Sequence, residues 1–197
     1  MDIPGWELLQ AHLLRFSKLT SDELQLLQPK LQTLHLRKGE RFAEAGKQAR
    51  LLGFILEGSM RHYYTYDGIE HTTYFYFENN LVADYIGCIT GKPSLLTIEA
   101  LSPCTLLVFD YQDLQQLFAR SHNWERFGRV LAEYIAAGLE ERMVTLLTLS
   151  PEERYRHLLE SGRDKILQRI PQHYIASYLG ITPVSLSRIR NRVARKQ

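Results

Sequence analysis

Near the N-terminus of the chain, apolar residues recur at the spacing of a helix. They are Trp6, Leu8, Leu9, Leu13 and Leu14. A second short helix is predicted to start at Ser21, with acids in its first turn, and to end at Pro29. These two segments predict a small helical cap on the structure that follows.

From about Leu31 to Phe109 the pattern changes to short, β-rich runs separated by glycines. The clearest pair of runs is MRHYYTYDGIEHTTYFYF, in which Asp67 and Gly68 suit the two left-handed positions of a tight turn. The flanking runs are rich in Tyr, Thr and Phe, which favour strands. Many short strands at this spacing predict an antiparallel sandwich or barrel.

After Asp110 the helical period returns, first in YQDLQQLFARS and then in a long run from Asn123 to Thr148. The long run carries an i, i+4 ladder of Phe127, Leu131, Ile135, Leu139, Met143 and Leu147. Other apolar residues widen the stripe: Trp124, Val130, Tyr134, Val144 and Leu146. A helix this broadly apolar needs two partners, which favours its own β domain and a second copy of the chain. The alternative is the long core helix of a monomer.

Beyond the long run, Ser150 is placed to cap a new helix that has proline at its first position and acids in its first turn. The C-terminal stretch IPQHYIASYLGITPVSLSRIRNRVARKQ then predicts two helices, from about Pro171 to Leu179 and from Pro183 onward, with Gly180 ending the first. On the second helix, an apolar stripe is formed by Leu186, Ile189 and Val193.

The opposite face of the last helix is polar and basic. It carries Val184, Ser187, Arg188, Asn191 and Arg195, with Arg192 at its edge. In a major groove, arginine suits guanine, asparagine suits adenine and valine suits the thymine methyl group. Ser185, near the start of the helix, suits a phosphate oxygen. This face therefore predicts contact with double-stranded DNA.

The distribution of charge points the same way. The net charge of the 197 residues is only +2, yet the segment from Ser150 onward carries 10 Lys and Arg against 4 Asp and Glu. Residues 1–149 carry 14 against 18. A compact basic segment of this kind is typical of a module that meets phosphate, and a solvated charged tail is the plainer alternative.

Other chemistry has little support in the sequence. The 45% hydrophobic content suits an ordinary soluble core, and no signal peptide or membrane span is present, so we expect a cytoplasmic protein. Cys88 and Cys104 share no metal-binding spacing, and the seven histidines are scattered, so we expect neither a metal nor a cofactor. Nothing marks a nucleophile or a phosphate-binding loop, so we do not expect an enzyme.

Three stretches together resemble the Crp/Fnr family of bacterial transcription regulators, over almost the whole chain. LHLRKGERFAEAGKQARLLGFILEGSMRHYY resembles the opening of the family's cyclic-nucleotide-binding β-roll. The run at 123–148 falls where the family keeps its dimerisation helix, and IASYLGITPVSLSRIR falls where it keeps its helix-turn-helix. The compact form is similar to short members from Bacteroidetes-type bacteria.

The resemblance implies an α+β fold in three parts. These are N-terminal helices with an antiparallel β-roll at 1–120, a dimerisation helix at 121–149 and a helix-turn-helix DNA-binding domain at 150–197. It also implies a homodimer that binds a two-fold DNA site, with one recognition helix in each major groove.

The same resemblance places an effector pocket at Ala83, Asp84, Tyr85, Lys92, Ser94 and Leu95. In cAMP-binding members an arginine at the second half of this stretch neutralises the cyclic phosphate, and that arginine is missing here. Because a buried phosphate without a cation is costly, we expect no cAMP binding in the usual pose. An unidentified effector has an aromatic group available, of which half should be core: Tyr63, Tyr64, Tyr66, Tyr74, Phe75, Tyr76 and Phe77.

The last helix departs from the family's catabolite activator, because Pro183, Val184 and Arg188 stand where that protein reads DNA with Arg, Glu and Arg. Many members continue into a β-hairpin wing, and we expect the basic tail, Arg192, Arg195 and Lys196, to supply phosphate contacts in its place. Two interpretations stay open: a dimeric DNA-binding regulator, and a ligand-binding or protein-interaction module without DNA binding.

Overall fold

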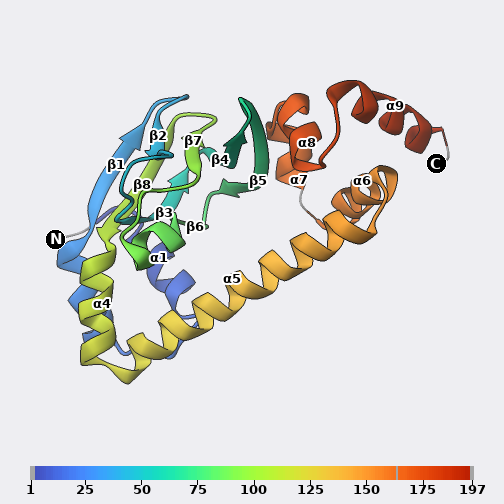
Figure 1. The fold of residues 1–197 in the computed structure, drawn as a ribbon. Coiled ribbons are helices and arrows are strands. Elements are labelled where there is room, and N and C mark those ends of the chain that lie inside the picture. Colours follow the sequence, from blue (N-terminus) through green and yellow to red (C-terminus); the bar gives the residue numbers. More distant parts are fainter. Residues whose placement is uncertain (1–2, 163, 196–197) are drawn as a thin grey trace.

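The structure is a computed structural model that describes residues 3–162 and 164–195. It contains a β-roll with helices at its N-terminal side, a long helix that leads away from the roll, and a group of C-terminal helices that returns to it (Figure 1). This is the predicted α+β fold with antiparallel sheets and flanking helices.

The β-roll consists of two four-stranded antiparallel sheets. One has the order β1-β8-β3-β6, with β1 (Gln32–Leu36), β8 (Cys104–Asp110), β3 (Leu51–Glu57) and β6 (Leu81–Val82). The other has the order β2-β7-β4-β5, with β2 (Arg41–Ala43), β7 (Thr97–Ala100), β4 (Ser59–Tyr66) and β5 (Ile69–Phe77). The turn between β4 and β5 has left-handed backbone at both Asp67 and Gly68, with φ of 49° and 73°, as predicted.

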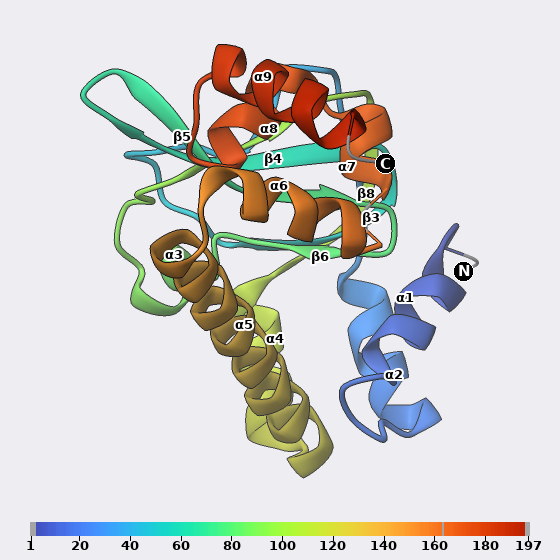
Figure 2. The ribbon, with the colours of Figure 1, turned by 90° about the vertical axis from the view of Figure 1, so that its right-hand side faces the viewer.

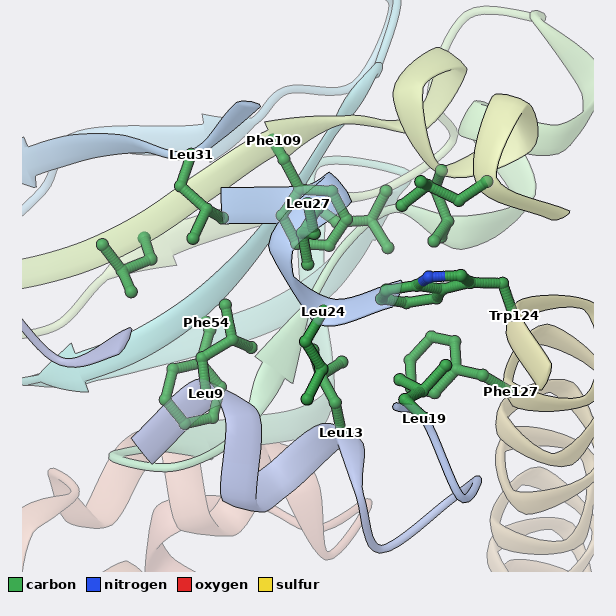
Figure 3. Close-up of a cluster of buried hydrophobic side chains, with 14 of the residues drawn as sticks. Leu9, Leu13, Leu19, Leu24, Leu27, Leu31, Phe54, Phe109, Trp124 and Phe127 are labelled. Atoms are coloured by element: carbon green, nitrogen blue, oxygen red, sulfur yellow. The ribbon is translucent and has the colours of Figure 1, made fainter. Parts of the chain in front are cut away.

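The helices on the N-terminal side close one end of the roll. They are α1 (Trp6–Leu13), α2 (Ser21–Leu27), the 3-10 turn Gln28–Lys30 and α4 (Tyr111–Arg120). Figure 3 shows how their apolar side chains meet those of the sheet and of the long helix α5 (His122–Thr148). Trp124 lies fully buried in this cluster, and its indole Nε1 donates to the carbonyl of Glu23 at 3.1 Å. The start of α5 is therefore fixed to the roll.

The two ends of the i, i+4 ladder on α5 have different surroundings. Each step of four residues advances about 40° around a helix, so the ladder drifts from one side of α5 to another. Phe127 and Leu131 are buried against the helical cap. Leu139, Met143 and Leu147 are 65%, 55% and 78% exposed. The second half of α5 therefore presents an apolar stripe that nothing covers within the described part of the chain.

The C-terminal helices form a module with its own core. We use the name C-terminal module for α6 (Pro151–Glu160), α7 (Asp164–Arg169), α8 (Gln172–Tyr178) and α9 (Pro183–Ala194). Ser150 caps α6, because its side chain accepts from the amide of Glu153 while the carboxylate of Glu153 accepts from the amide of Ser150. This cap is the one that the sequence predicts. Neither α7 nor the short helix α3 (Tyr85–Thr90) was predicted.

A substitution at Gly58, in the turn into β4, can test how tightly the roll is packed. Its φ is +104°, and a Cβ there would lie 2.5 Å from the carbonyl oxygen of Pro103 and 2.9 Å from the Cα of Cys104. We expect Gly58→Ala to lower the free energy of unfolding by about 2–5 kcal/mol, from left-handed strain plus overpacking. Chemical denaturation measures this loss.

Gly46→Ala is the matched control, because Gly46 has a φ of +83° but no atom within 4 Å of the added Cβ. It should cost only the backbone term, about 1–2 kcal/mol. Equal losses for the two variants would contradict the packing described around Gly58.

Candidate nucleic-acid interface and effector pocket

The last two helices, α8 and α9, are joined by a short turn that the sequence sets locally. Gly180 takes a left-handed φ of 67° after α8, and the amide of Ile181 returns to the carbonyl of Ala176 at 3.0 Å. Thr182 then caps α9 by accepting from the amide of Ser185 at 3.2 Å, and Pro183 occupies the first helical position. The crossing of the two helices is thus set by these backbone and capping bonds.

One stripe of α9 is buried, and the opposite face is open. Leu186, Ile189 and Val193 are 1%, 3% and 7% exposed, as the apolar stripe predicts. The open face carries the exposed residues Val184, Ser187, Arg188, Asn191 and Arg195. Within the described residues, Arg188 and Arg195 form no ion pair, so this face is basic and unneutralised.

The remaining predicted residues of this surface lie at its margin. The hydroxyl of Ser185 shares a hydrogen bond with that of Thr182 at 3.0 Å, so Ser185 also supports the helix cap. Arg192 lies 3.3 Å from the carboxylate of Glu152 on α6 and keeps 59% of its side chain exposed. Lys196 lies outside the described residues.

The C-terminal module packs against the outer face of β5. Phe75 and Phe77 are 4% and 8% exposed, and they belong to the same apolar cluster as the core of the module. The hydroxyl of Ser177 on α8 accepts from the amide of Thr72 and donates to the carbonyl of Glu70, both at 2.9 Å. Figure 2 shows the module lying over β4 and β5. Because β5 is an edge strand, Ser177 satisfies backbone groups that pairing leaves free.

Arg61 of β4 is buried between the roll and the module, at 1% exposure. Its guanidinium lies over the rings of Tyr63 and of Tyr174 on α8, 3.9 Å from each ring centroid. Its Nη2 lies 2.5 Å from the carboxylate of Glu70 and 3.5 Å from that of Glu99. A buried charge is tolerated only when it is paired in this way. Arg61 therefore makes a specific, buried contact between the roll and the module.

Glu78 forms a second polar contact with the module at the end of β5. Its carboxylate lies 2.9 Å from Nζ of Lys165 and 2.8 Å from Arg169, both on α7. It also accepts from the amide of Gly58 at 3.2 Å. The hydrogen bond from Arg169 is the main cause that lowers the pKa of Glu78 to about 2, so the group is charged at neutral pH.

The long helix α5 contacts the module as well. The guanidinium of Arg142 lies 3.9 Å from the ring centroid of Tyr178 and donates to the carbonyl of that residue. The Tyr178 ring also meets Phe75, with 5.5 Å between centroids. Arg154 of α6 donates to the carbonyl of Leu146 on α5 at 3.0 Å. The position of α8 is therefore tied to both the roll and α5.

The inner faces of β4 and β5 carry three of the predicted aromatic residues: Tyr64, Tyr74 and Tyr76. His62 packs edge-on against Tyr64 and Tyr76, and Tyr76 lies 4.8 Å from Tyr74 between ring centroids. His62 also bonds to the hydroxyl of Thr73. Burial raises the pKa of Tyr76 and lowers that of His62 to about 4, so both side chains are neutral at pH 7. Uncharged rings therefore lie together on this face of the roll.

The six residues of the predicted effector pocket have different surroundings. Ala83 and Tyr85 pack on the cluster beneath the helical cap. Ser94 is buried and its hydroxyl bonds to both backbone groups of Leu96, while Lys92 and Leu95 are exposed. Burial is the main cause that raises the pKa of Tyr64 and Tyr76, and the charge of the nearby Asp84 adds to it.

Asp84 is 3% exposed and caps α3 by accepting from the amide of Gly87 at 2.9 Å. Its second oxygen has no hydrogen-bond partner among the described residues, and a Cβ at Gly87 would lie 2.2 Å from that oxygen. Gly87 is therefore needed for the cap. No residue of this stretch offers the bidentate cation that a buried phosphate requires.

Sequence reasoning missed the residues at the boundary between roll and module: Arg61, Glu78, Arg142 and Ser177. Arg61 carries one local signal, since it is a lone cation in an apolar β run, and such a residue requires a buried partner. The partners lie far along the chain, and nothing in the local pattern identifies them.

No group of three or more His, Cys, Asp or Glu side chains among the described residues is arranged to hold a metal ion. Among the same residues, no helix combines the length and the apolar character that crossing a membrane requires.

The fold and site define a class: an antiparallel β-roll joined by a long helix to a helical module that ends in an exposed basic helix. Residues 33–121 match the family model of the cyclic nucleotide-binding domain. A search of curated proteins finds no significant match.

Solved structures with the same fold include regulators of the Crp/Fnr family. FixK2 from Bradyrhizobium japonicum is similar with a TM-score of 0.71 and 18% identity, over 84% of this chain and 85% of that one. A putative Crp/Fnr-family regulator from Eubacterium rectale has a TM-score of 0.68 and 16% identity, over 98% and 88%. The c-di-GMP-responsive regulator CLP from Xanthomonas campestris has a TM-score of 0.68 and 15% identity, over 90% and 93%. At these identities the likeness shows a shared fold.

Two histidines, His12 and His62, should make the free energy of unfolding depend on pH. Burial is the main cause that lowers the pKa of His62 and of His12, which packs on Phe16 and Phe54, to about 4. An unfolded chain binds these protons near pH 6.5, so the stabilisation is full above pH 6.5 and is lost as pH falls toward 4. Each histidine contributes a slope of up to about 1.4 kcal/mol per pH unit.

Replacing both histidines by glutamine should flatten the curve of unfolding free energy between pH 6.5 and 4, measured by urea denaturation. His71→Gln, at an exposed position on β5, should leave the slope in place. An unchanged slope in the double variant would show that neither buried imidazole sets the acid response.

Proposed function

We propose that this chain is a dimeric, DNA-binding transcriptional regulator of the Crp/Fnr type. The observation that carries the proposal is the geometry of α9: a buried stripe anchors the helix, and its open face presents Arg188, Asn191 and Arg195 with no acid to neutralise them. In this role α8 and α9 form a helix-turn-helix whose second helix enters the major groove. Structures of the same fold support the proposal, because two of them are named as transcriptional regulators.

The contacts that we assign to DNA divide into two groups. Arg188, Asn191, Val184 and Ser187 are placed to meet base edges, since they share the centre of the open face. We assign backbone phosphates to Ser185 and Arg192 at the margin, and to Arg195 at the C-terminal end of the open face. The pairing of Arg192 with Glu152 then holds one phosphate contact in place.

The apolar stripe of α5 supports a homodimer. Leu139, Met143 and Leu147 are large, exposed and aligned, and burying them against a second copy removes apolar surface from water. In this assignment residues 1–120 form the sensing part, 121–149 the dimerisation helix and 150–197 the DNA-binding domain.

The roll in this proposal is a sensor or scaffold that does not take cAMP in the usual pose. The phosphate-pairing arginine is missing, and the Ser94 hydroxyl is already bonded to the backbone of Leu96. Asp84 and the neutral aromatic residues of the inner face are the groups that an effector would meet. Such a ligand needs no cationic partner.

The DNA-binding surface is tested by fluorescence anisotropy of the purified protein with a random pool of duplexes, at several salt concentrations. We expect binding that weakens steeply with salt, because phosphate contacts release counterions. On a duplex selected from the pool, Arg188→Ala should cost about 1–3 kcal/mol, the value of one bidentate contact to guanine.

Arg190→Ala is the control for charge, because Arg190 lies on the same helix but lines a separate hollow beside Tyr155 and Gln172. It should weaken binding less and leave sequence preference unchanged. Salt-independent binding, or none at any salt, would favour the alternative of a protein-interaction module.

The dimer is tested by Leu139→Glu, which places a charge in the centre of the exposed stripe. We expect sedimentation equilibrium to give the mass of two chains for the wild type and of one chain for the variant, because a buried unpaired carboxylate is costly. Ala137→Glu adds the same charge to the opposite, exposed side of α5 and should remain dimeric. A monomeric wild type would refute this assignment.

A further inference from the structure

The β-roll and the C-terminal module meet in a packed interface, which we call the joint. It consists of Phe75 and Phe77 with the module's core, and of the contacts of Arg61, Glu78, Arg142 and Ser177. Phe75 and Phe77 contribute to the module's apolar core from the strand β5, so the two parts share one buried cluster. Separating them would expose both rings and would leave the charge of Arg61 without the ring of Tyr174. The module is therefore held in one orientation relative to the roll.

The joint is connected to α9 through rigid structure. Ser177 and Tyr178, which contact β5 and Arg142, are the last residues of α8. Two residues later the left-handed Gly180 begins the turn, and the Thr182 cap fixes the start of α9. A change in how α8 sits on β5 thus becomes a change in the direction of α9.

The same joint relates α9 to the proposed dimer axis. Arg142 joins α8 to α5, and Arg154 joins α6 to the end of α5, beside the exposed stripe through which two copies would pair. In a two-fold protein, the separation of the two recognition helices sets the separation of the half-sites that it binds. The joint uses no residue of the open face of α9, so it acts on spacing without contacting bases.

We propose that Arg61 and Glu78 are positioning residues which fix the half-site spacing of the DNA that this protein binds. This inference rests on the proposed function of dimeric DNA binding. A firm joint pre-organises the two recognition helices for one spacing, whereas a loose joint allows several spacings at lower affinity, since ordering the module then costs entropy on binding.

Glu78→Gln is the main variant, because it removes the charge that Lys165 and Arg169 share while its amide oxygen still accepts from Gly58. Ser177→Ala is combined with it to remove the bridge to Thr72 and Glu70. Arg61→Lys keeps the charge but loses the planar stacking between Tyr63 and Tyr174.

Glu44→Gln is the matched control. Glu44 also pairs with two cations, Arg41 and Lys47, each at 2.6 Å, but it lies within the roll and away from the module. Its loss should therefore change neither the spacing preference nor the joint.

The experiment uses a palindromic duplex selected by the wild type, and versions with one or two base pairs inserted or removed between the half-sites. We expect the wild type to show a sharp optimum. For Glu78→Gln the ratio between the affinity at the optimum and that one base pair away should fall about two- to fivefold, with a larger fall for the double variant and for Arg61→Lys. Hydrogen exchange at the amide of Thr72 should accelerate in the same variants.

The outcomes distinguish a failure of the proposed DNA binding from a failure of the positioning role. A wild type that binds no duplex overturns the proposed function itself. A wild type that binds with a sharp optimum, beside a double variant with the same spacing profile, overturns the positioning role and leaves DNA binding intact. A flattened profile in Glu44→Gln as well would also overturn it, because the effect would then follow from any lost ion pair.

Discussion

The packing of the C-terminal module on the outer face of β5 is the contact on which the rest of the structure depends. Alternate residues of a strand point to opposite sides, so a single strand can serve two cores. Tyr74 and Tyr76 face the inside of the roll, while Phe75 and Phe77 complete the core of the module. Any change inside the roll that moves this strand also moves the surface on which α8 rests.

Polar groups give this apolar contact its direction. Apolar burial is not directional, and two phenylalanines alone would allow the module to slide. The bonds of Ser177 to the edge of β5 set the register. The stacking of Arg61 on Tyr174 and the ion pairs of Glu78 with α7 restrict the angle of the module. Ion pairs as exposed as those of Glu78 add little to stability, so their main effect here is on orientation.

The local parts of this fold could be predicted from the sequence. The apolar stripe of α9, the Ser150 cap and the turn at Asp67 and Gly68 depend on neighbours within a few residues, and all three are present. The helix α3 could not be predicted in this way, because its six residues show no helical period and Asp84 must cap it from within a β-rich region. For the same reason the sequence did not indicate the surroundings of this stretch: Ala83 and Tyr85 pack on the cluster beneath the helical cap, whereas Asp84 caps α3.

The joint residues could not be predicted because their partners are remote in sequence. Arg61 meets Tyr174 far along the chain, and Glu78 lies 87 and 91 residues from its partners Lys165 and Arg169. A pattern with a period of a few residues holds no information about such pairs. Sequence therefore predicted which helix is exposed and basic, and the structure added what holds that helix in place.

The most direct test of the account is a crystal structure of the protein bound to a duplex selected from a random pool. We expect two chains related by a two-fold axis along α5, with α9 of each chain in a major groove and Arg188 at a base edge. The contacts of Ser177 and Glu78 with their partners should be retained. A complex in which α9 lies outside the groove, or in which the module has left β5, would contradict this account.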